Sequence, residues 1–231
     1  MREGHQGTGP GAITPDGCAV DVYRRLGAGI EPDVIEAAVP AGASLLELGC
    51  GAGRVTEPLV RRGFAVTAVD ESAEMLEAVR ERVPGVEAVR SPIESLELAR
   101  RFDVVILASF LVHTAEHRTR QAFLETCRRH VTDDGCVLIQ REGEDWHRNL
   151  PREREDPAGC TVRIVSADPV GDGVDSVLAE YVFPDTTWTQ TFRSRHLSKE
   201  DFERHLGEAG LVVDTYLTDD ATWVRARPKS P

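Results

Sequence analysis

One short stretch, Ser44 to Arg54, constrains the fold of this chain more than any other, and it reads SLLELGCGAGR. Leu45, Leu46 and Leu48 form a short apolar run that predicts a buried strand. Glycines follow at alternate positions, and a helical pattern of apolar residues then begins at Val55. Because glycine has no Cβ, the backbone can turn tightly here, adopt positive φ and let a ligand lie directly against it. The stretch therefore predicts the first half of a mononucleotide-binding unit.

The acids around this turn distinguish between nucleotide ligands. A dinucleotide fingerprint, G-x-G-x-x-G, would place its third glycine where the sequence has Arg54. Glu47 precedes the first glycine and suits a ligand with an ammonium group, whereas a pyrophosphate needs free N–H groups and no nearby negative charge. Asp70 ends the apolar run VTAVD, 21 residues after Gly49, near the spacing at which an acid meets ribose hydroxyls. A nicotinamide-dependent oxidoreductase is therefore disfavoured.

The acid, the glycine turn and the second acid resemble motif I and the ribose-binding acid of the class I S-adenosylmethionine-dependent methyltransferases. The resemblance extends over about residues 40–142 and 194–227. It implies S-adenosylmethionine as the cofactor and S-adenosylhomocysteine as the product. By position, it implies that Glu47 contacts the methionine ammonium and that Asp70 accepts both ribose hydroxyls. The full set of expected cofactor-binding residues is Glu47, Gly49, Cys50, Gly51, Gly53, Asp70, Glu71, Met75, Ile93, Glu94, Ala108 and Ser109.

The part of the sequence that would bind the adenine ring of the cofactor departs from the family's pattern. Many relatives have an Asp after the third strand, and Pro92 occupies that position here. Proline offers neither a side-chain acceptor nor an N–H. We therefore expect Glu94 to contact the adenine amino group, and Ile93 to supply a backbone N–H and an apolar wall. Ala108 and Ser109, just past the next strand, are expected to border the methionine portion.

The rest of the core alternates between strand and helix patterns. Strand composition recurs at 64–69, 86–90, 102–109 and 136–142, and helical patterns lie at 72–83 and 118–130. This order predicts a Rossmann-like, doubly wound α/β sheet with right-handed crossovers. The resemblance implies seven strands, of which the last is antiparallel, and a closing helix capped by Ser198.

Three regions lie outside this core. Residues 1–17 are rich in Gly and Pro and predict a flexible tail. Residues 18–40 predict two short helices, which the resemblance makes a cover over the ligand cleft. Residues 158–195 contain three strand-like runs with turn signals between them, which predict a small antiparallel β insertion over the active-site face. We expect one methyltransferase domain over residues 18–231.

Composition excludes several partner classes. The net charge of −12 argues against a nucleic-acid partner, because phosphate contacts need clustered Lys and Arg. No run approaches the roughly 20 apolar residues that span a bilayer. The five cysteines form no C-x-x-C pair and no zinc spacing, so we expect reduced thiols, a cytoplasmic protein and no metal site. A small-molecule substrate remains, bound by a monomer or homodimer.

Candidate catalytic residues follow the fourth and fifth strands. The implied cofactor carries an activated methyl group, so the protein supplies binding and alignment, with a general base only where the acceptor must lose a proton. His113 suits that role because an unperturbed histidine has a pKa of about 6.5, and Glu142 is the second candidate. The alternative for His113 is a structural hydrogen bond at a helix start. The expected substrate-binding residues are Tyr23, His113, Arg141, Trp146, Trp188 and Arg193.

The sequence thus predicts an enzyme that methylates an N, O or C nucleophile of a small molecule. Arginine greatly outnumbers lysine, which occurs only at Lys199 and Lys229, and this bias favours a GC-rich bacterial genome and a secondary metabolite or its precursor as substrate. Two alternatives remain: an enzyme that uses the same cofactor for a cyclisation or decarboxylation, and an inactive relative that binds the cofactor or a protein partner.

Overall fold

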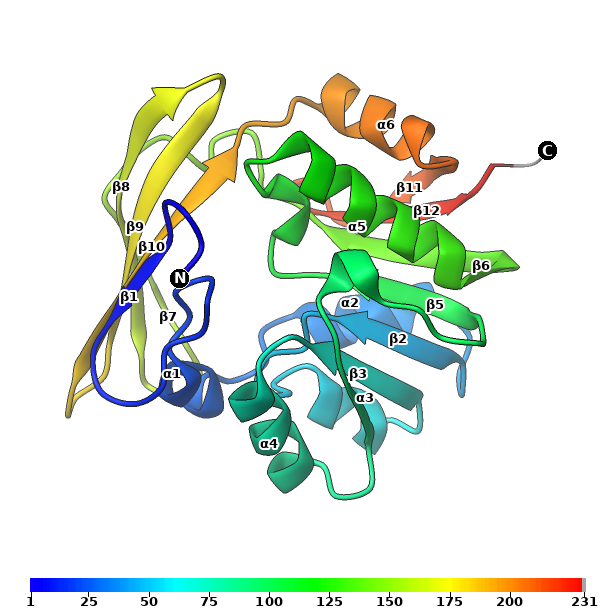
Figure 1. Ribbon diagram of the computed structural model, residues 1–231, viewed down its shortest axis with the longest axis horizontal. Coiled ribbons are helices and arrows are strands. Elements are labelled where there is room, and N and C mark those ends of the chain that lie inside the picture. The colour runs from blue at the N-terminus through cyan, green and yellow to red at the C-terminus, as the bar shows by residue number, and fades with distance from the viewer. Residues whose placement is uncertain (230–231) are drawn as a thin grey trace. The chain divides into compact units, whose positions relative to one another are not determined.

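The computed structural model describes residues 1–229, in which the chain forms two units, each with its own sheet (Figure 1). Unit 1 comprises Met1–Gly29 and Glu144–His196, and unit 2 comprises Ile30–Gly143 and the chain from Leu197 onward. The sequence predicted one domain over 18–231 with an insertion. Instead, the predicted helical cover is divided, because residues 18–29 belong to unit 1 and residues 30–40 to unit 2.

Unit 2 contains a seven-stranded sheet, and its order confirms the predicted doubly wound topology. All neighbouring strands are parallel except at β12, which is antiparallel to both of its neighbours. Across the sheet the strands are β11 (Leu211–Tyr216), β12 (Trp223–Pro228), β6 (Val131–Gln140), β5 (Phe102–Leu107), β2 (Ser44–Leu48), β3 (Ala65–Asp70) and β4 (Glu87–Arg90). The chain runs outward from β2 in one direction and then returns to β5 on its other side, so the switch point lies between β2 and β5.

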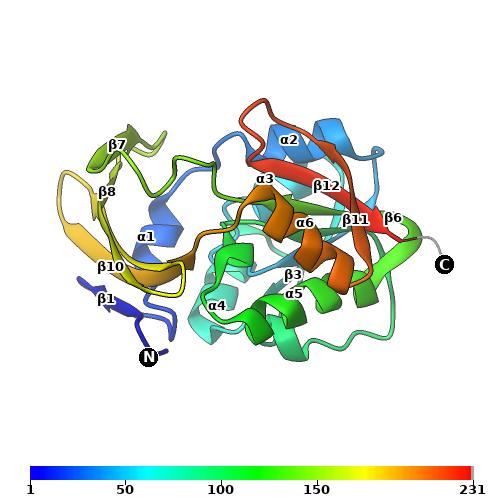
Figure 2. The ribbon, with the colours of Figure 1, turned by 90° about the horizontal axis from the view of Figure 1, so that it is seen from above.

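Helices cover both faces of this sheet, as Figure 2 shows for α2 on one side and for α5 and α6 on the other. The helices are α2 (Glu31–Ala38), α3 (Thr56–Arg61), α4 (Ala73–Arg82), α5 (His117–His130) and α6 (Lys199–Glu208), with single 3₁₀ turns η1 (Ile93–Ser95) and η2 (Leu111–His113). Because side chains alternate along a strand, Leu45 packs with α2 and α3, whereas Leu46 and Leu48 pack in the opposite layer with α5 and α6. Both layers are fully buried, as a parallel sheet requires.

Unit 1 is built on a five-stranded sheet in which every pair is antiparallel. Its order is β1 (Gln6–Thr8), β10 (Thr187–Arg195), β9 (Val174–Val182), β8 (Thr161–Gly171) and β7 (Arg152–Glu155), and its helix is α1 (Val20–Arg25). The three predicted strands are therefore present, and β7 is a further strand that lies before the predicted insertion at 158–195.

The N-terminal prediction is corrected at the first 17 residues. Instead of a flexible tail, they contribute β1, in which Gly7 pairs with Gln190 of β10. The backbone hydrogen bonds of this ladder offset the low hydrophobicity that suggested disorder. No helix within residues 1–229 is long and apolar enough to cross a membrane.

Candidate functional site

The glycine turn follows β2 directly, at the carboxyl edge of the unit 2 sheet. Gly49, Gly51 and Gly53 have φ of 69°, 54° and 78°, in the left-handed region that disfavours other residues. A Cβ placed on Gly49 would lie 2.7 Å from Cδ1 of Leu111. Glycine at this position is therefore required both by the backbone conformation and by the close approach of the Leu111 side chain.

Asp70 ends β3, the strand beside β2, and its carboxylate organises this turn. Its Oδ2 accepts a hydrogen bond from the backbone N–H of Gly51 at 2.9 Å, and its Oδ1 accepts one from the N–H of Ser72, also at 2.9 Å. Both bonds hold the carboxylate in one orientation. Since each carboxylate oxygen can accept more than one hydrogen bond, a vicinal diol can bind to the same group.

Glu47 is buried on β2, beneath the turn. Its Oε2 accepts a hydrogen bond from Oγ1 of Thr56 at 2.6 Å. Burial raises the pKa of this carboxyl to about 7, against the opposing effects of the Thr56 hydrogen bond and the charge of Arg54. A cationic group bound nearby would favour the ionised form, so the residue fits the ammonium end of an amino-acid ligand.

Arg54 explains why the turn is not a dinucleotide site. Its Nη1 lies 2.6 Å from Oε1 of Glu31 on α2, and both side chains are largely buried. The side chain thus fixes α2 beside the glycine turn, where the dinucleotide fingerprint would need a glycine. Sequence reasoning noted Arg54 only as a departure from that fingerprint, and nothing in the spacing identified Glu31 as its partner.

The residues expected around an adenine ring lie on α4 and η1. Met75 is buried on α4, whose start is capped by the Ser72 hydroxyl accepting from the Met75 N–H at 3.2 Å. Ile93 is buried at the start of η1, and its carbonyl accepts a hydrogen bond from Oγ1 of Thr126 at 3.0 Å. Glu94 is exposed, and its carboxylate is accessible to a ligand.

The chain makes an unusual turn after β5. Ser109 and Phe110 have φ of 54° and 61°, although neither is a glycine, and two adjacent left-handed residues are uncommon and strained. The N–H of Ser109 donates to Oε1 of Gln140, at the end of β6, at 2.8 Å. This turn directs the chain into η2, while Ala108 remains half-buried at the strand end. The sequence analysis missed Phe110 and Gln140, because no residue pattern signals a strained turn without glycine.

His113 and Glu142 lie together, as their positions after neighbouring strands suggested, and both side chains are only 3% exposed. Nδ1 of His113 is 3.2 Å from Oε2 of Glu142, and the backbone N–H of Glu142 donates to Nε2 of His113 at 2.9 Å. An Nε2 that accepts a hydrogen bond is unprotonated, so Nδ1 carries the proton and donates it to the carboxylate. Both ring nitrogens thus contact Glu142, and this geometry suits positioning. A general-base role for either residue stays a prediction.

Two expected substrate contacts have buried structural surroundings instead. Arg141 of unit 2 is 3% exposed; its Nη2 donates to the Leu197 carbonyl at 2.8 Å, and its guanidinium lies over the Phe202 ring. Trp188 of unit 1 is 1% exposed, and its Nε1 donates to the Pro10 carbonyl at 2.7 Å. Both geometries favour packing roles over contact with a substrate.

The remaining expected substrate contacts, Tyr23, Trp146 and Arg193, all lie in unit 1. The Tyr23 hydroxyl is 3.5 Å from Sγ of Cys18, and burial raises its pKa well above the usual value. Trp146 packs edge-on against His147, and Arg193 faces Glu3 at 3.3 Å. Their contact with a substrate stays a prediction.

Comparisons with known proteins agree with this geometry. Residues 45–135 match the family model described as a methyltransferase domain. A trans-aconitate 2-methyltransferase of Azoarcus sp. (strain BH72) is 26% identical over 199 residues, which cover 82% of this chain and 69% of that protein. A ubiquinone biosynthesis O-methyltransferase of Caulobacter sp. (strain K31) is 34% identical over 104 residues, which cover 42% of this chain and only 40% of that relative.

Solved structures share the fold. The sugar N-methyltransferase KedS8 from Streptoalloteichus sp ATCC 53650 aligns with a TM-score of 0.71 at 18% identity, covering 96% of this chain and 98% of that one. SAM-bound CalS10, an amino pentose methyltransferase from Micromonospora echinaspora, aligns with a TM-score of 0.68 at 19% identity, covering 90% and 95%. At these identities the likeness concerns the fold.

Proposed function

We propose that this chain, which belongs to the class I S-adenosylmethionine-dependent methyltransferases, transfers the cofactor's methyl group to an N, O or C nucleophile of a small molecule. The observation that carries the proposal is the arrangement at the carboxyl edge of β2 and β3. There, a backbone surface of three left-handed glycines lies beside a carboxylate held by two N–H groups.

Each part of that arrangement matches one part of the cofactor. In the proposal, the Asp70 carboxylate accepts the ribose hydroxyls, and Glu47 faces the ammonium of the methionine portion. Met75, Ile93 and Glu94 surround the adenine. The donor set fits S-adenosylmethionine, because it offers one carboxylate to a diol, one buried carboxyl to a cation and bare backbone between them.

The bound cofactor supplies a methyl group activated by its sulfonium. The task of the chain's own residues is then to bind, orient and exclude water. Holding two reactants in line is worth as much as about 7–11 kcal/mol of the barrier. The hydrogen bonds between His113 and Glu142 fix the start of the segment after β6, so in the proposal these two residues maintain the geometry at the strand ends.

Several observations support a small-molecule acceptor. The relatives carry names that refer to trans-aconitate, ubiquinone biosynthesis and sugars, all of them small molecules. The net charge of −12 disfavours nucleic acid. All five cysteines are unpaired, which supports the reducing cytoplasm as the compartment. A monomer or homodimer stays part of the proposal.

The test uses methyl-labelled S-adenosylmethionine and fractionated extract of the host, separated into small molecules, protein and RNA. We expect label in the small-molecule fraction, and an Asp70→Ala variant should lose it together with about 100-fold or more of cofactor affinity, since two charge-assisted hydrogen bonds are worth about 3 kcal/mol or more. Asp134→Ala, which makes the same change at an exposed carboxylate on β6, should behave like the wild type.

The other outcomes separate the alternatives. Label in protein or RNA would contradict a small-molecule acceptor. Tight cofactor binding without transfer to any fraction would favour a non-methylating reaction or an inactive relative. Equal loss in both variants would mean that the effect of Asp70→Ala does not come from the cofactor site.

A further inference from the structure

Two groups of histidine and carboxylate side chains within residues 1–229 bring their donor atoms within 4.8 Å of one another. One, the unit 1 group, consists of His147, Asp175 and His196. The other, the helix group, consists of His117, His205 and Glu208 on α5 and α6. We propose that the unit 1 group is a binding site for a divalent transition-metal ion such as Zn²⁺, with two imidazole nitrogens and one carboxylate oxygen as its protein ligands.

The three donor atoms of the unit 1 group converge on one point. Nδ1 of His147 lies 2.9 Å from Oδ2 of Asp175, and Nε2 of His196 lies 2.7 Å from the same oxygen. The two imidazole rings are stacked, with their centroids 3.8 Å apart. Tetrahedral ligands around Zn²⁺ at about 2.0–2.2 Å are about 3.3–3.6 Å apart, so binding an ion requires these donor atoms to move apart by several tenths of an ångström.

The backbone holds two of the ligands in place before any ion binds. Asp175 is the second residue of β9 and pairs with Ser194, the second-last residue of β10. His196 follows β10 directly, and its N–H donates to the Gly173 carbonyl at 2.8 Å. The ladder between β9 and β10 therefore fixes the separation of these two side chains, which lowers the entropy lost on metal binding.

The charge of the group also favours a cation. The Asp175 side chain is buried, and its hydrogen bonds and ion pairs are those with the two imidazoles. A buried carboxylate flanked by two imidazoles is a donor set that divalent transition metals prefer.

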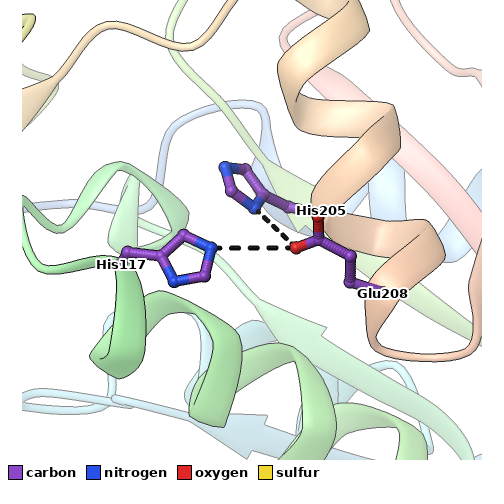
Figure 3. A group of neighbouring side chains, drawn as sticks. All are labelled: His117, His205 and Glu208. Carbon is purple, nitrogen blue, oxygen red and sulfur yellow. Dashed lines mark hydrogen bonds and ion pairs between the residues drawn. The ribbon is translucent and has the colours of Figure 1, made fainter.

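The helix group has similar residues in different surroundings (Figure 3). Oε2 of Glu208 lies 3.3 Å from Nδ1 of His205 and 3.7 Å from Nε2 of His117. However, Arg204 donates to Oε1 of Glu208 at 3.0 Å, and Arg120 approaches Nε2 of His205 at 3.5 Å. A guanidinium can only donate, so this Nε2 accepts and the proton of His205 faces Glu208.

The two arginines thus give the helix group a cationic environment and occupy the lone pairs that a metal needs. It is an ion-pair network, and it serves as the matched control for the unit 1 group. In the unit 1 group, by contrast, the side chain of His196 is half exposed. With three protein ligands, the bound ion keeps at least one position for water or for an oxygen of a small molecule.

The experiment titrates Co²⁺, a spectroscopic substitute for Zn²⁺, into the purified full chain after treatment with a chelator. We expect one equivalent to bind with the visible absorption of imidazole- and carboxylate-bound cobalt, and Zn²⁺ to displace it. Asp175→Asn and His196→Ala should each weaken binding at least tenfold. If either variant does not fold, His147→Ala replaces it. His117→Ala and Glu208→Gln should leave the titration unchanged.

Three results would overturn the proposal. One is the absence of stoichiometric binding to the wild-type chain. A second is full binding by folded Asp175→Asn and His196→Ala variants, with folding checked by thermal melting. The third is a loss of binding in the helix-group variants. None of these results depends on methyl transfer, so the outcome is independent of the proposed function.

Discussion

Units 1 and 2 differ in how their functional residues can be recognised. In unit 2, the candidate cofactor site is built from residues close in sequence to the ends of β2 and β3, because the backbone itself forms the binding surface. In unit 1, the candidate metal site joins His147, Asp175 and His196, which are 28 and 21 residues apart. A site made of backbone leaves a motif in the sequence, whereas a site made of side chains from separate segments does not.

The buried acids of the two units show the same contrast in their energetics. Glu47 is buried with a neutral hydroxyl as its hydrogen-bond donor, and burial raises its pKa to about 7. Asp175 is buried between two imidazoles, with a nitrogen of each within 2.9 Å of its Oδ2. Unit 2 therefore keeps a buried carboxyl that a cationic ligand would stabilise in its ionised form, and unit 1 keeps one whose polar partners are side chains of the same unit.

The largest effect is expected from Trp188→Ala in unit 1. The side chain is 1% exposed and packs edge-on against Phe183, so its removal should destabilise unit 1 by about 3–5 kcal/mol. Hydrogen exchange should increase in β9 and β10 while β2 and β3 remain protected, and cofactor affinity should change less than about twofold. A matching loss of protection in β2 and β3 would show that the two units unfold together.

Gly49→Ala tests whether the backbone of the glycine turn in unit 2 forms the ligand surface. The new Cβ would sit at φ of 69° and 2.7 Å from Cδ1 of Leu111, so we expect cofactor affinity, measured by calorimetry, to fall about 100-fold. Gly63→Ala is the control, because φ is 88° there but no atom lies within 4 Å of the new Cβ. The Gly63→Ala variant should have a similar backbone strain but an unchanged cofactor affinity. Equal affinity losses in both variants would contradict a role for the turn as a ligand surface.

His113→Ala tests whether the histidine positions Glu142 or removes a proton. It removes the contacts that the His113 ring makes with the buried carboxylate and with the backbone N–H of Glu142, so we expect thermal unfolding to show a loss of about 1–3 kcal/mol. His130→Ala is matched, because the His130 ring is also buried and hydrogen-bonded through both nitrogens, to Thr126 and Leu98. If His113→Ala alone abolishes the acidic limb of the pH–rate profile without loss of stability, the general-base prediction is correct and the positioning role is not.

The smallest expected effect is the dependence of stability and cofactor affinity on pH. Because the pKa of Glu47 is raised to about 7, the folded ligand-free protein holds a proton there that the unfolded chain releases above about pH 4.5. Its contribution to stability is therefore present at low pH and declines as the pH rises toward 7.

An ammonium ligand prefers the ionised form, so cofactor affinity should rise about tenfold between pH 6 and pH 8. Glu47→Gln should bind more weakly at high pH and lose this dependence. Parallel affinity profiles for the two proteins would mean that Glu47 does not face the ammonium group.

The sequence predicted most of the unit 2 fold, because alternating strands and helices leave strong periodicities and glycines are required where φ is positive. It predicted three strands of unit 1 but missed β1, since Gln6–Thr8 has no apolar character and gains its order from pairing with β10. The roles of single residues were harder to predict from the sequence than the fold. Arg141 and Trp188 were predicted to contact a substrate from their positions after the fifth strand and in the inserted strands, and the sequence did not indicate that both side chains are at least 97% buried.

What the sequence determined by itself is the set of residues that forms the candidate ligand surface. Glu47, the three glycines and Asp70 lie within 24 residues, and the physical demands on a backbone surface leave few other residues possible there. Only the tertiary structure decided which side chains meet from a distance: Arg54 with Glu31, and His147 with Asp175 and His196. Such contacts depend on how strands and helices pair, and many residue spacings can satisfy the same pairing, so a spacing alone does not reveal them.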